Sequence, residues 1–214
     1  MKDHSISTDK ARYDTYIVAN YLDTDAVKTS TKFYNTTFPS DMIITKDDAS
    51  TSDEQVENLT REFNIHYRAC IGSLIYLLYT RADLIFSVHK LATFLLDPGK
   101  VRFDLLVHLL IYMSENKTLV FNYYADVKDA PLYNLLRKAN IKTDNQLMAF
   151  SDSSWQDFPD TGRSTGAYII FYQGRPIYHG AYVPRPVAQS SVESEYNAAC
   201  TSGMAFALFR MLID

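Results

Sequence analysis

The chain has 214 residues, of which 47% are hydrophobic and 14% aromatic, a composition that excludes a disordered protein and allows one or two domains with a buried core. The formal net charge is −4 and no basic stripe is visible, so nucleic-acid binding has to be argued from motifs rather than from charge. No apolar run is long enough to span a bilayer, and residues 1–14 contain no apolar signal core. We therefore expect an intracellular protein, cytoplasmic or nuclear, with no membrane partner, in which Cys70 and Cys200 are reduced thiols of the core.

The N-terminal half of the chain is predicted to be mainly helical. Residues 10–22 place apolar side chains on one helical face, and a long polar connection follows over residues 30–54. Three further helices are expected from Asn58 onward, and the sequence Asp-Pro-Gly at residues 97–99 separates the second from the third. β-Branched and aromatic residues favour a strand over residues 118–124. The apolar positions of the three helices are Ile71, Leu74, Ile75 and Leu78, then Leu84, Val88, Leu91 and Leu95, then Leu105, Leu106, Leu109, Leu110 and Met113.

The C-terminal part is predicted to be a meander of strands followed by one helix. A polar linker over residues 126–145 precedes it. Gln173 and Gly174 suit a tight hairpin between the second and third strands. Ser190 and Glu193 have the spacing of a capping box, which predicts that the helix begins there. The expected strands are residues 146–152, 166–172 and 175–182.

Two acidic residues in this part are candidate metal ligands. Asp152 lies at the end of the first strand, where an aspartate is also common as a turn former. Glu195 lies on the flank of an expected buried stripe, where an unpaired carboxylate is costly. Carboxylates from two elements suit Mg²⁺, and we expect their oxygens to face each other across a shallow cleft within about 8 Å. A two-metal nuclease site needs about four acidic ligands, of which these would be two. The expected stripe consists of Val192, Tyr196, Ala199, Gly203 and Phe206.

Three further residues are candidates for contact with nucleic acid. Trp155 could stack on a base or a sugar, although a packed aromatic at the rim of the domain explains it as well. Arg163 and Ser164 could contact phosphate, and a solvated turn before a strand explains them equally. No phosphate-binding glycine loop and no catalytic Cys/His pairing is present in the sequence. No residue is therefore predicted to bind an organic cofactor.

Four segments of the sequence carry ordered motifs. Residues 67–91 contain YRACIGSLIYL and TRADLIFSVHKL, and three later segments read SDSSW (151–155), GRSTGAY (162–168) and SSVESEY (190–196). Together they resemble the Pol polyproteins of copia-type LTR retrotransposons, in which the first segment follows the palm and thumb of the reverse transcriptase. The other three resemble the motifs SDADWA, RKSTSGY and SSTEAEY of the ribonuclease H domain in that family.

The resemblance implies an α+β fold, in which a helical thumb and connection module is followed by a truncated ribonuclease H-like domain of three antiparallel strands and one helix. It implies that Asp152 is the first metal-ligand aspartate and Glu195 the ligand glutamate of that domain. Two departures from the family motifs are mild, with Ala82 in place of proline and Ser194 in place of alanine. The implied division is 1–60 (thumb-like helix and loop), 61–125 (helical connection module with a terminal strand), 126–145 (linker) and 146–214 (partial ribonuclease H-like domain).

The resemblance also implies descent from an enzyme that uses Mg²⁺ or Mn²⁺ to hydrolyse the RNA strand of RNA–DNA hybrids. The two remaining ligands of the family follow the helix that holds Glu195, and the sequence ends at Asp214. We therefore expect weak or absent metal binding and no activity. One alternative is a non-catalytic fragment that binds hybrid, a polymerase or other Pol segments, and another is a nuclease that receives acidic ligands from a second chain.

The first strand of the predicted meander is expected to have one unpaired edge. In the complete family fold, as the resemblance implies, a fourth strand pairs with it in parallel. Unpaired edges recruit other strands, so we expect the chain to self-associate or to require a partner.

Overall fold

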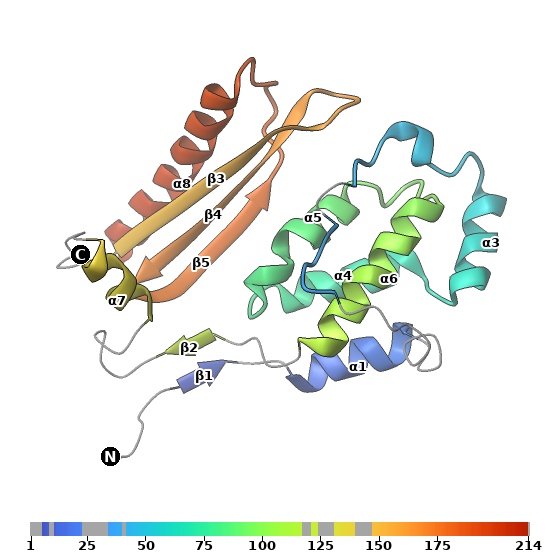
Figure 1. Ribbon diagram of the computed structural model, residues 1–214, viewed down its shortest axis with the longest axis horizontal. Helices are drawn as coiled ribbons and strands as arrows, with labels where there is room; N and C mark the ends of the chain where they lie inside the picture. Colours follow the sequence, from blue (N-terminus) through green and yellow to red (C-terminus); the bar gives the residue numbers. More distant parts are fainter. Residues whose placement is uncertain are drawn as a thin grey trace. The chain divides into compact units, whose positions relative to one another are not determined.

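The computed structural model describes residues 6–8, 11–22, 34–39, 42–116, 121–123, 131–139 and 147–213. The chain divides into two compact units, which are described separately (Figure 1). The helical unit comprises residues 10–119, and the sheet unit comprises residues 1–9 and 120–214. The mixture of helices with an antiparallel sheet confirms the α+β class, whereas the thumb and ribonuclease H assignments stay predictions.

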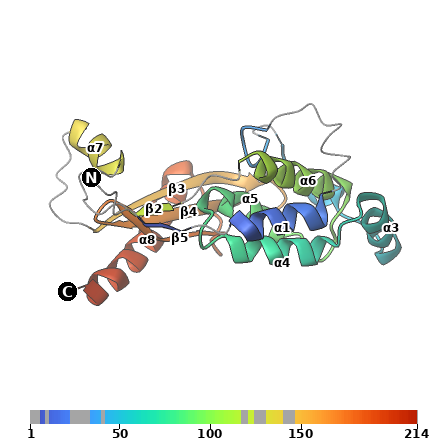
Figure 2. The ribbon, with the colours of Figure 1, turned by 90° about the horizontal axis from the view of Figure 1, so that it is seen from below.

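The helical unit is built around one helix, α6 (Lys100–Glu115), that is apolar on nearly every side. Such a helix has to be buried all round, and α1 and α3 are among the elements that pack against it. Helix α1 also contacts α4, and α1, α4 and α6 lie side by side in Figure 2. The other elements of the unit are α1 (Ala11–Tyr21), η1 (Lys46–Asp48), α3 (Asp53–Phe63), α4 (Tyr67–Leu77), η2 (Ala82–Leu84) and α5 (Ile85–Ala92).

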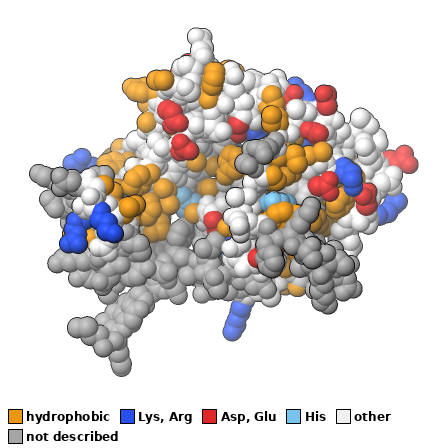
Figure 3. Space-filling view, in the orientation of Figure 1, with side chains coloured by type: hydrophobic (Ala, Val, Ile, Leu, Met, Phe, Trp, Pro, Cys, Tyr) orange, Lys and Arg blue, Asp and Glu red, His pale blue; other side chains and the backbone are white. Residues whose placement is uncertain are grey.

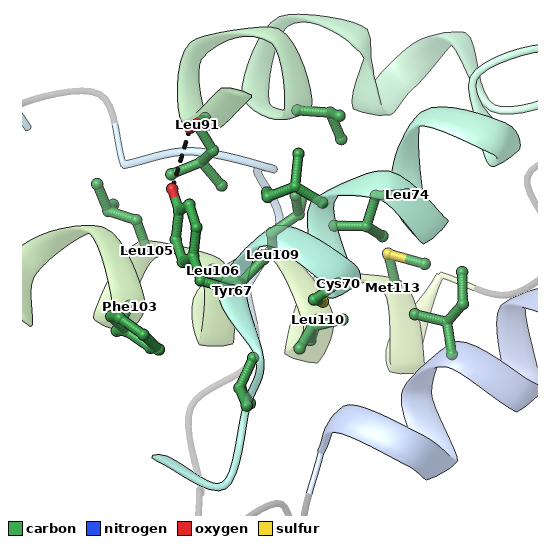
Figure 4. Close-up of a cluster of buried hydrophobic side chains, with 14 of the residues drawn as sticks. Tyr67, Cys70, Leu74, Leu91, Phe103, Leu105, Leu106, Leu109, Leu110 and Met113 are labelled. Carbon is green, nitrogen blue, oxygen red and sulfur yellow. Dashed lines mark hydrogen bonds between the residues drawn. The ribbon is translucent and has the colours of Figure 1, made fainter. Parts of the chain in front are cut away.

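The core of the helical unit confirms most of the predicted apolar positions. Leu74 of α4, Leu91 of α5 and Leu109 of α6 are fully buried and converge in Figure 4. The hydroxyl of Tyr67 donates a hydrogen bond to the carbonyl oxygen of Leu91 at 3.1 Å, so its polar atom is satisfied inside the core. Ile75 is an exception, because it is exposed although its spacing predicted burial.

Two details set the boundaries of the helices in this unit. Helix α3 begins at Asp53, before the predicted start at Asn58, because the hydroxyl of Ser52 accepts the N–H of Gln55 and caps the first turn. The predicted break before α6 is present, and steric crowding explains why its last residue, Gly99, has no side chain. A Cβ atom at this position would lie 1.7 Å from the carbonyl oxygen of Asp48.

A buried ion network joins α1 to the segment that precedes α5. Arg81 Nη1 donates to Asp14 Oδ2 at 2.7 Å, and Arg81 Nη2 donates to Asp83 Oδ2 at 2.8 Å. The hydroxyl of Tyr112 donates to the same Asp83 oxygen at 3.2 Å. Burial lowers the pKa of Arg81, but its hydrogen bonds and charge interactions with Asp83 and Asp14 outweigh this effect and raise the pKa. The arginine and aspartate of the TRAD motif therefore have a structural role, because they tie the first helix to the rest of the unit.

The sheet unit contains a three-stranded antiparallel meander with the order β3-β4-β5. Gln173 and Gly174 both have positive φ (50° and 72°), as a type I′ hairpin turn requires, and the predicted hairpin is confirmed. A second, two-stranded sheet pairs β1 with β2. The strand expected over residues 118–124 is present as β2, whereas its partner β1 was not predicted. The elements of the unit are β1 (Ile6–Thr8), β2 (Phe121–Tyr123), α7 (Pro131–Lys138), β3 (Leu147–Phe158), β4 (Arg163–Tyr172), β5 (Arg175–Tyr182) and α8 (Ser191–Ile213).

Helix α8 lies along one face of the meander (Figure 1) and turns small residues toward it. Ser194, Ala198 and Ser202, spaced four residues apart, are the buried residues of the helix. The stripe predicted to be buried is wrong, because Val192 and Tyr196 are among the most exposed apolar residues of the chain. The physical reason is the close approach of helix and sheet, which favours short side chains at the contact. Cys70 is buried as predicted, but the prediction that Cys200 is a core thiol is also wrong, because it lies exposed on α8.

Candidate functional site

Asp152 lies near the middle of β3, which extends six residues beyond the predicted strand end. In the register of the sheet it stands opposite Ala167 of β4. Its side chain is exposed. Asp152 is therefore a strand residue rather than a turn former.

Glu195 lies in the first turns of α8 and is also exposed. Its neighbour Glu193 has the capping role that the sequence predicted. Ser190 Oγ accepts the N–H of Glu193 at 3.1 Å, and Glu193 Oε2 accepts the N–H of Gln189 at 2.8 Å. Of the two glutamates, only Glu195 is left as a candidate ligand.

The register of β3 decides whether Asp152 and Glu195 can meet. Ser153 is hydrogen-bonded through its hydroxyl to Ser194, so this residue of β3 points toward α8. Successive side chains of a strand point to opposite faces, and Asp152 therefore points to the face that α8 does not cover. This register gives no support for the expected shared cleft.

The described residues consequently do not fit a shared Mg²⁺ site. Among the parts of the chain that the structure describes, no group of three or more His, Cys, Asp or Glu side chains could hold a metal ion. A one-residue shift of the β3 register would bring Asp152 to the α8 face, because the side-chain period of a strand is two. The roles of Asp152 and Glu195 as metal ligands stay predictions.

The end of β3 carries an irregularity that the sequence did not reveal. A bulge lies between Ser154 and Phe158, and Gln156 has a positive φ of 53°. Asp157 Oδ2 accepts the hydroxyl hydrogen of Thr165 at 2.7 Å across this bulge. Bulges redirect side chains and are common next to functional sites, but they interrupt the two-residue pattern from which a strand is predicted. The run of small polar residues before Trp155 is the only sequence signal of this change.

The three candidate nucleic-acid residues lie around the same strand ends. The indole N–H of Trp155 donates to the carbonyl oxygen of Ala188 at 3.1 Å, which fixes the ring while leaving 43% of the residue exposed. Ser164 is buried, and its hydroxyl accepts the N–H of Gln156 at 3.1 Å. Arg163 is exposed. Trp155 and Arg163 are thus available for contact with a ligand, whereas Ser164 holds the bulge.

The motif GRSTGAY, which includes Gly166 and Tyr168, is explained by packing between β4 and β5. Gly166 stands opposite Tyr182, and a Cβ atom at Gly166 would lie 2.8 Å from that ring. Gly180 stands opposite Tyr168, and a Cβ atom at Gly180 would lie 2.9 Å from the ring of Tyr168. Two tyrosine rings therefore cover two glycines across the strands, and the hydroxyl of Tyr182 donates to the carbonyl oxygen of Asn197 on α8.

One tyrosine of the sheet unit has a raised pKa. Burial, together with a hydrogen bond to the neighbouring Tyr178, raises the pKa of Tyr168 to about 12. Basic side chains on the face drawn in Figure 3 lie singly or in small groups rather than in one stripe.

Within the described parts of the chain, no helix is long and apolar enough to cross a membrane.

Comparisons with known proteins agree with the motifs. The chain is 29% identical over 136 residues to the retrovirus-related Pol polyprotein from transposon RE2 of Arabidopsis thaliana, and 28% identical over 137 residues to the one from transposon RE1. Each match covers 64% of this chain but only 8% of the polyprotein, so the chain spans a small part of these relatives. It is also 28% identical over 136 residues to secreted RxLR effector protein 161 of Plasmopara viticola, of which the match covers 84%.

No family model matches the chain, and no solved structure matches it significantly. The two polyprotein matches confirm the predicted resemblance to a segment of a retrotransposon Pol polyprotein.

Proposed function

From the similarity to a segment of retrotransposon Pol polyproteins, we propose that residues 147–213 are the N-terminal part of a ribonuclease H-like domain that does not cleave RNA by itself. The order of parts supports the first half of this proposal. An aspartate on the first of three antiparallel strands is followed by a helix that begins at the motif SSVESEY. By descent, the ligand of such a domain is an RNA–DNA hybrid.

One observation supports the lack of activity. Ser153 faces α8, and the alternation of side chains along the strand turns Asp152 to the other face, which argues against convergence of the two candidate carboxylates on one ion. A nuclease of this class needs its metal ligands gathered at one point, because the ions position water and the leaving oxygen. We propose weak or absent binding of Mg²⁺ and Mn²⁺, and the structure supplies no geometry from which a catalytic step can be derived.

A cleavage assay tests the proposal. Purified chain is incubated with an end-labelled RNA–DNA hybrid in Mg²⁺ or Mn²⁺, and no RNA cleavage above background is expected. Cleavage that is lost in both Asp152→Asn and Glu195→Gln, but kept in the matched surface change Asp160→Asn, would contradict the proposal. That result would restore the reading of an active nuclease.

A second candidate function is binding without catalysis. The exposed ring of Trp155, held in place by its hydrogen bond to Ala188, is the observation that favours it, because fixed aromatic rings stack on unpaired bases. Fluorescence anisotropy with a labelled hybrid that carries a single-stranded overhang measures this binding. The change Trp155→Ala is expected to weaken it about tenfold, whereas Tyr79→Ala, at an exposed aromatic of the helical unit, is expected to leave it unchanged. Equal affinities of both variants and wild type would remove this candidate.

A further inference from the structure

Helix α8 is more apolar on the side that faces solvent than on the side that faces the sheet. Its buried contacts are Ser194, Ala198 and Ser202. Its exposed side carries large apolar side chains, such as Tyr196 at 70% and Met204 at 68% exposure. Soluble proteins rarely leave a row of such residues uncovered, and a helix that is apolar all round is normally buried on both sides. The outer side of α8 therefore has the chemistry of a contact surface.

The exposed residues form a row with a spacing of four along the outer side of the helix. We call the row of every fourth residue from Tyr196 to Leu208 the α8 ridge. No member of it is charged. The members of the α8 ridge are Tyr196, Cys200, Met204 and Leu208.

The charges of α8 select a partner for this ridge. The helix contains only three charged residues, with Glu193 and Glu195 at one end and Arg210 at the other. An antiparallel second copy, centred at Ser202, brings Arg210 of each copy to the level of Glu193 and Glu195 of the other. A parallel copy would instead place like charges side by side and align the two helix dipoles unfavourably. The α8 surfaces of two copies related by a two-fold axis are thus complementary in shape and charge, which is the requirement of an isologous dimer.

We propose that this face is a homodimer interface, in which the α8 ridges of two copies of the chain pack antiparallel around a two-fold axis on the outer side of the helix, at the level of Ser202. In that arrangement Cys200 lies opposite Met204 of the second copy, and Tyr196 lies opposite Leu208. The inference is independent of the proposed function, because it uses no metal ligand and no contact with nucleic acid. It also differs from association through the edge of β3, which leaves α8 exposed.

The mass of the full chain in solution is the first test. Sedimentation over roughly a hundredfold range of concentration is expected to give twice the chain mass of 24.5 kDa at the upper end. The change Met204→Glu places two carboxylates next to the two-fold axis, so the mass is expected to halve. The matched change Leu96→Glu, at an 82% exposed leucine of the helical unit, is expected to keep the dimer. Thermal melting of each variant confirms that the fold is retained.

Cross-linking tests the direction and register of the pair. In Met204→Cys the new thiol lies opposite Cys200 of the second copy, and oxidation by copper phenanthroline is expected to give a covalent dimer. The double variant Met204→Cys with Cys200→Ser is expected to cross-link far more slowly, and so is the wild-type chain, because like positions of the two copies are displaced along the helices. Cross-linking of the wild type as fast as that of Met204→Cys would indicate a parallel pair and overturn the proposal. A wild-type monomer at every concentration, or a dimer that survives Met204→Glu, would also overturn it.

Discussion

Helices α6 and α8 are both apolar around most of their circumference, yet they are buried in opposite ways. Helix α6 is surrounded by the other helices of its unit, and most of its large side chains are inaccessible. Helix α8 buries only the small residues Ser194, Ala198 and Ser202. Phe209 contacts the ring of Tyr178 on β5, but most other large apolar side chains of the helix are exposed. Two apolar helices therefore differ in their environment: α6 lies in a hydrophobic core, whereas α8 leaves large apolar side chains exposed to solvent. The comparison indicates that the helical unit buries its own apolar side chains, whereas the outer side of α8 in the sheet unit is suited to contact with a partner.

The largest loss of stability is expected from breaking the buried ion network of the helical unit. The change Arg81→Met leaves Asp14 buried without its charge partner, and the free energy of unfolding is expected to fall by about 3–5 kcal/mol. Urea unfolding followed by circular dichroism measures this. The control is Arg61→Met, which removes an exposed pair with Glu57 and is expected to cost less than about 0.5 kcal/mol. Equal effects of the two changes would mean that the network does not organise the unit.

A matched pair of leucine truncations tests the comparison of the two helices directly. Leu109→Ala removes a fully buried side chain of α6 and is expected to cost about 2–5 kcal/mol. Leu208→Ala removes a half-exposed side chain of α8 and is expected to cost less than about 1 kcal/mol in the monomer. The measurement is the urea midpoint at a protein concentration low enough to avoid association. A large cost at Leu208 would show that α8 is covered within its own chain.

Two glycines in the sheet unit should respond in opposite directions to the same change. Gly166→Ala forces a Cβ atom to 2.8 Å from the ring of Tyr182 and is expected to cost about 1–3 kcal/mol. Gly203 on the outer side of α8 has nothing within 4 Å of its missing Cβ, so Gly203→Ala is expected to stabilise the helix by up to about 1 kcal/mol. Thermal melts of the two variants give the signs. Destabilisation by Gly203→Ala in dilute solution would contradict an open outer face.

The sequence predicted the helical unit better than the sheet unit, for a physical reason. Leu74, Leu91 and Leu109 repeat with the helical period, and their burial follows from that pattern because each helix packs large apolar side chains against the others. In α8 the same reasoning chose Val192 and Tyr196 as buried, although the residues that the helix buries are the small Ser194, Ala198 and Ser202. Periodicity gives the apolar side of a helix, but the partner on that side is a property of the tertiary structure.

Whether the candidate site assembles depends on a feature of the same kind. The motifs located Asp152 on a strand and Glu195 on a helix, and both placements hold. The face to which Asp152 points depends on the register between β3 and α8, and a shift of one residue reverses it. Nothing in the local sequence fixes that register, whereas the contact between Ser153 and Ser194 does. Predicting the site required the pairing of two hydroxyls that have no distinctive pattern.

The buried thiol of Cys70 in the helical unit is expected to have the smallest effect on stability at neutral pH and a marked effect at high pH. Burial raises the pKa of Cys70 from its ordinary value of 9.0 to about 12, and it also raises the pKa of Tyr67. A raised pKa in the folded state means that stability is complete below the unfolded pKa and is lost as the pH rises toward the folded pKa. The contribution of Cys70 to the free energy of unfolding should therefore be constant up to about pH 8 and be lost between about pH 9 and pH 12. The change Cys70→Ala is expected to reduce that slope, and iodoacetamide should modify the exposed Cys200 before Cys70. An unchanged slope in the variant, or equal rates of modification, would mean that the core around Cys70 opens readily and that the helical unit is not the more closed of the two.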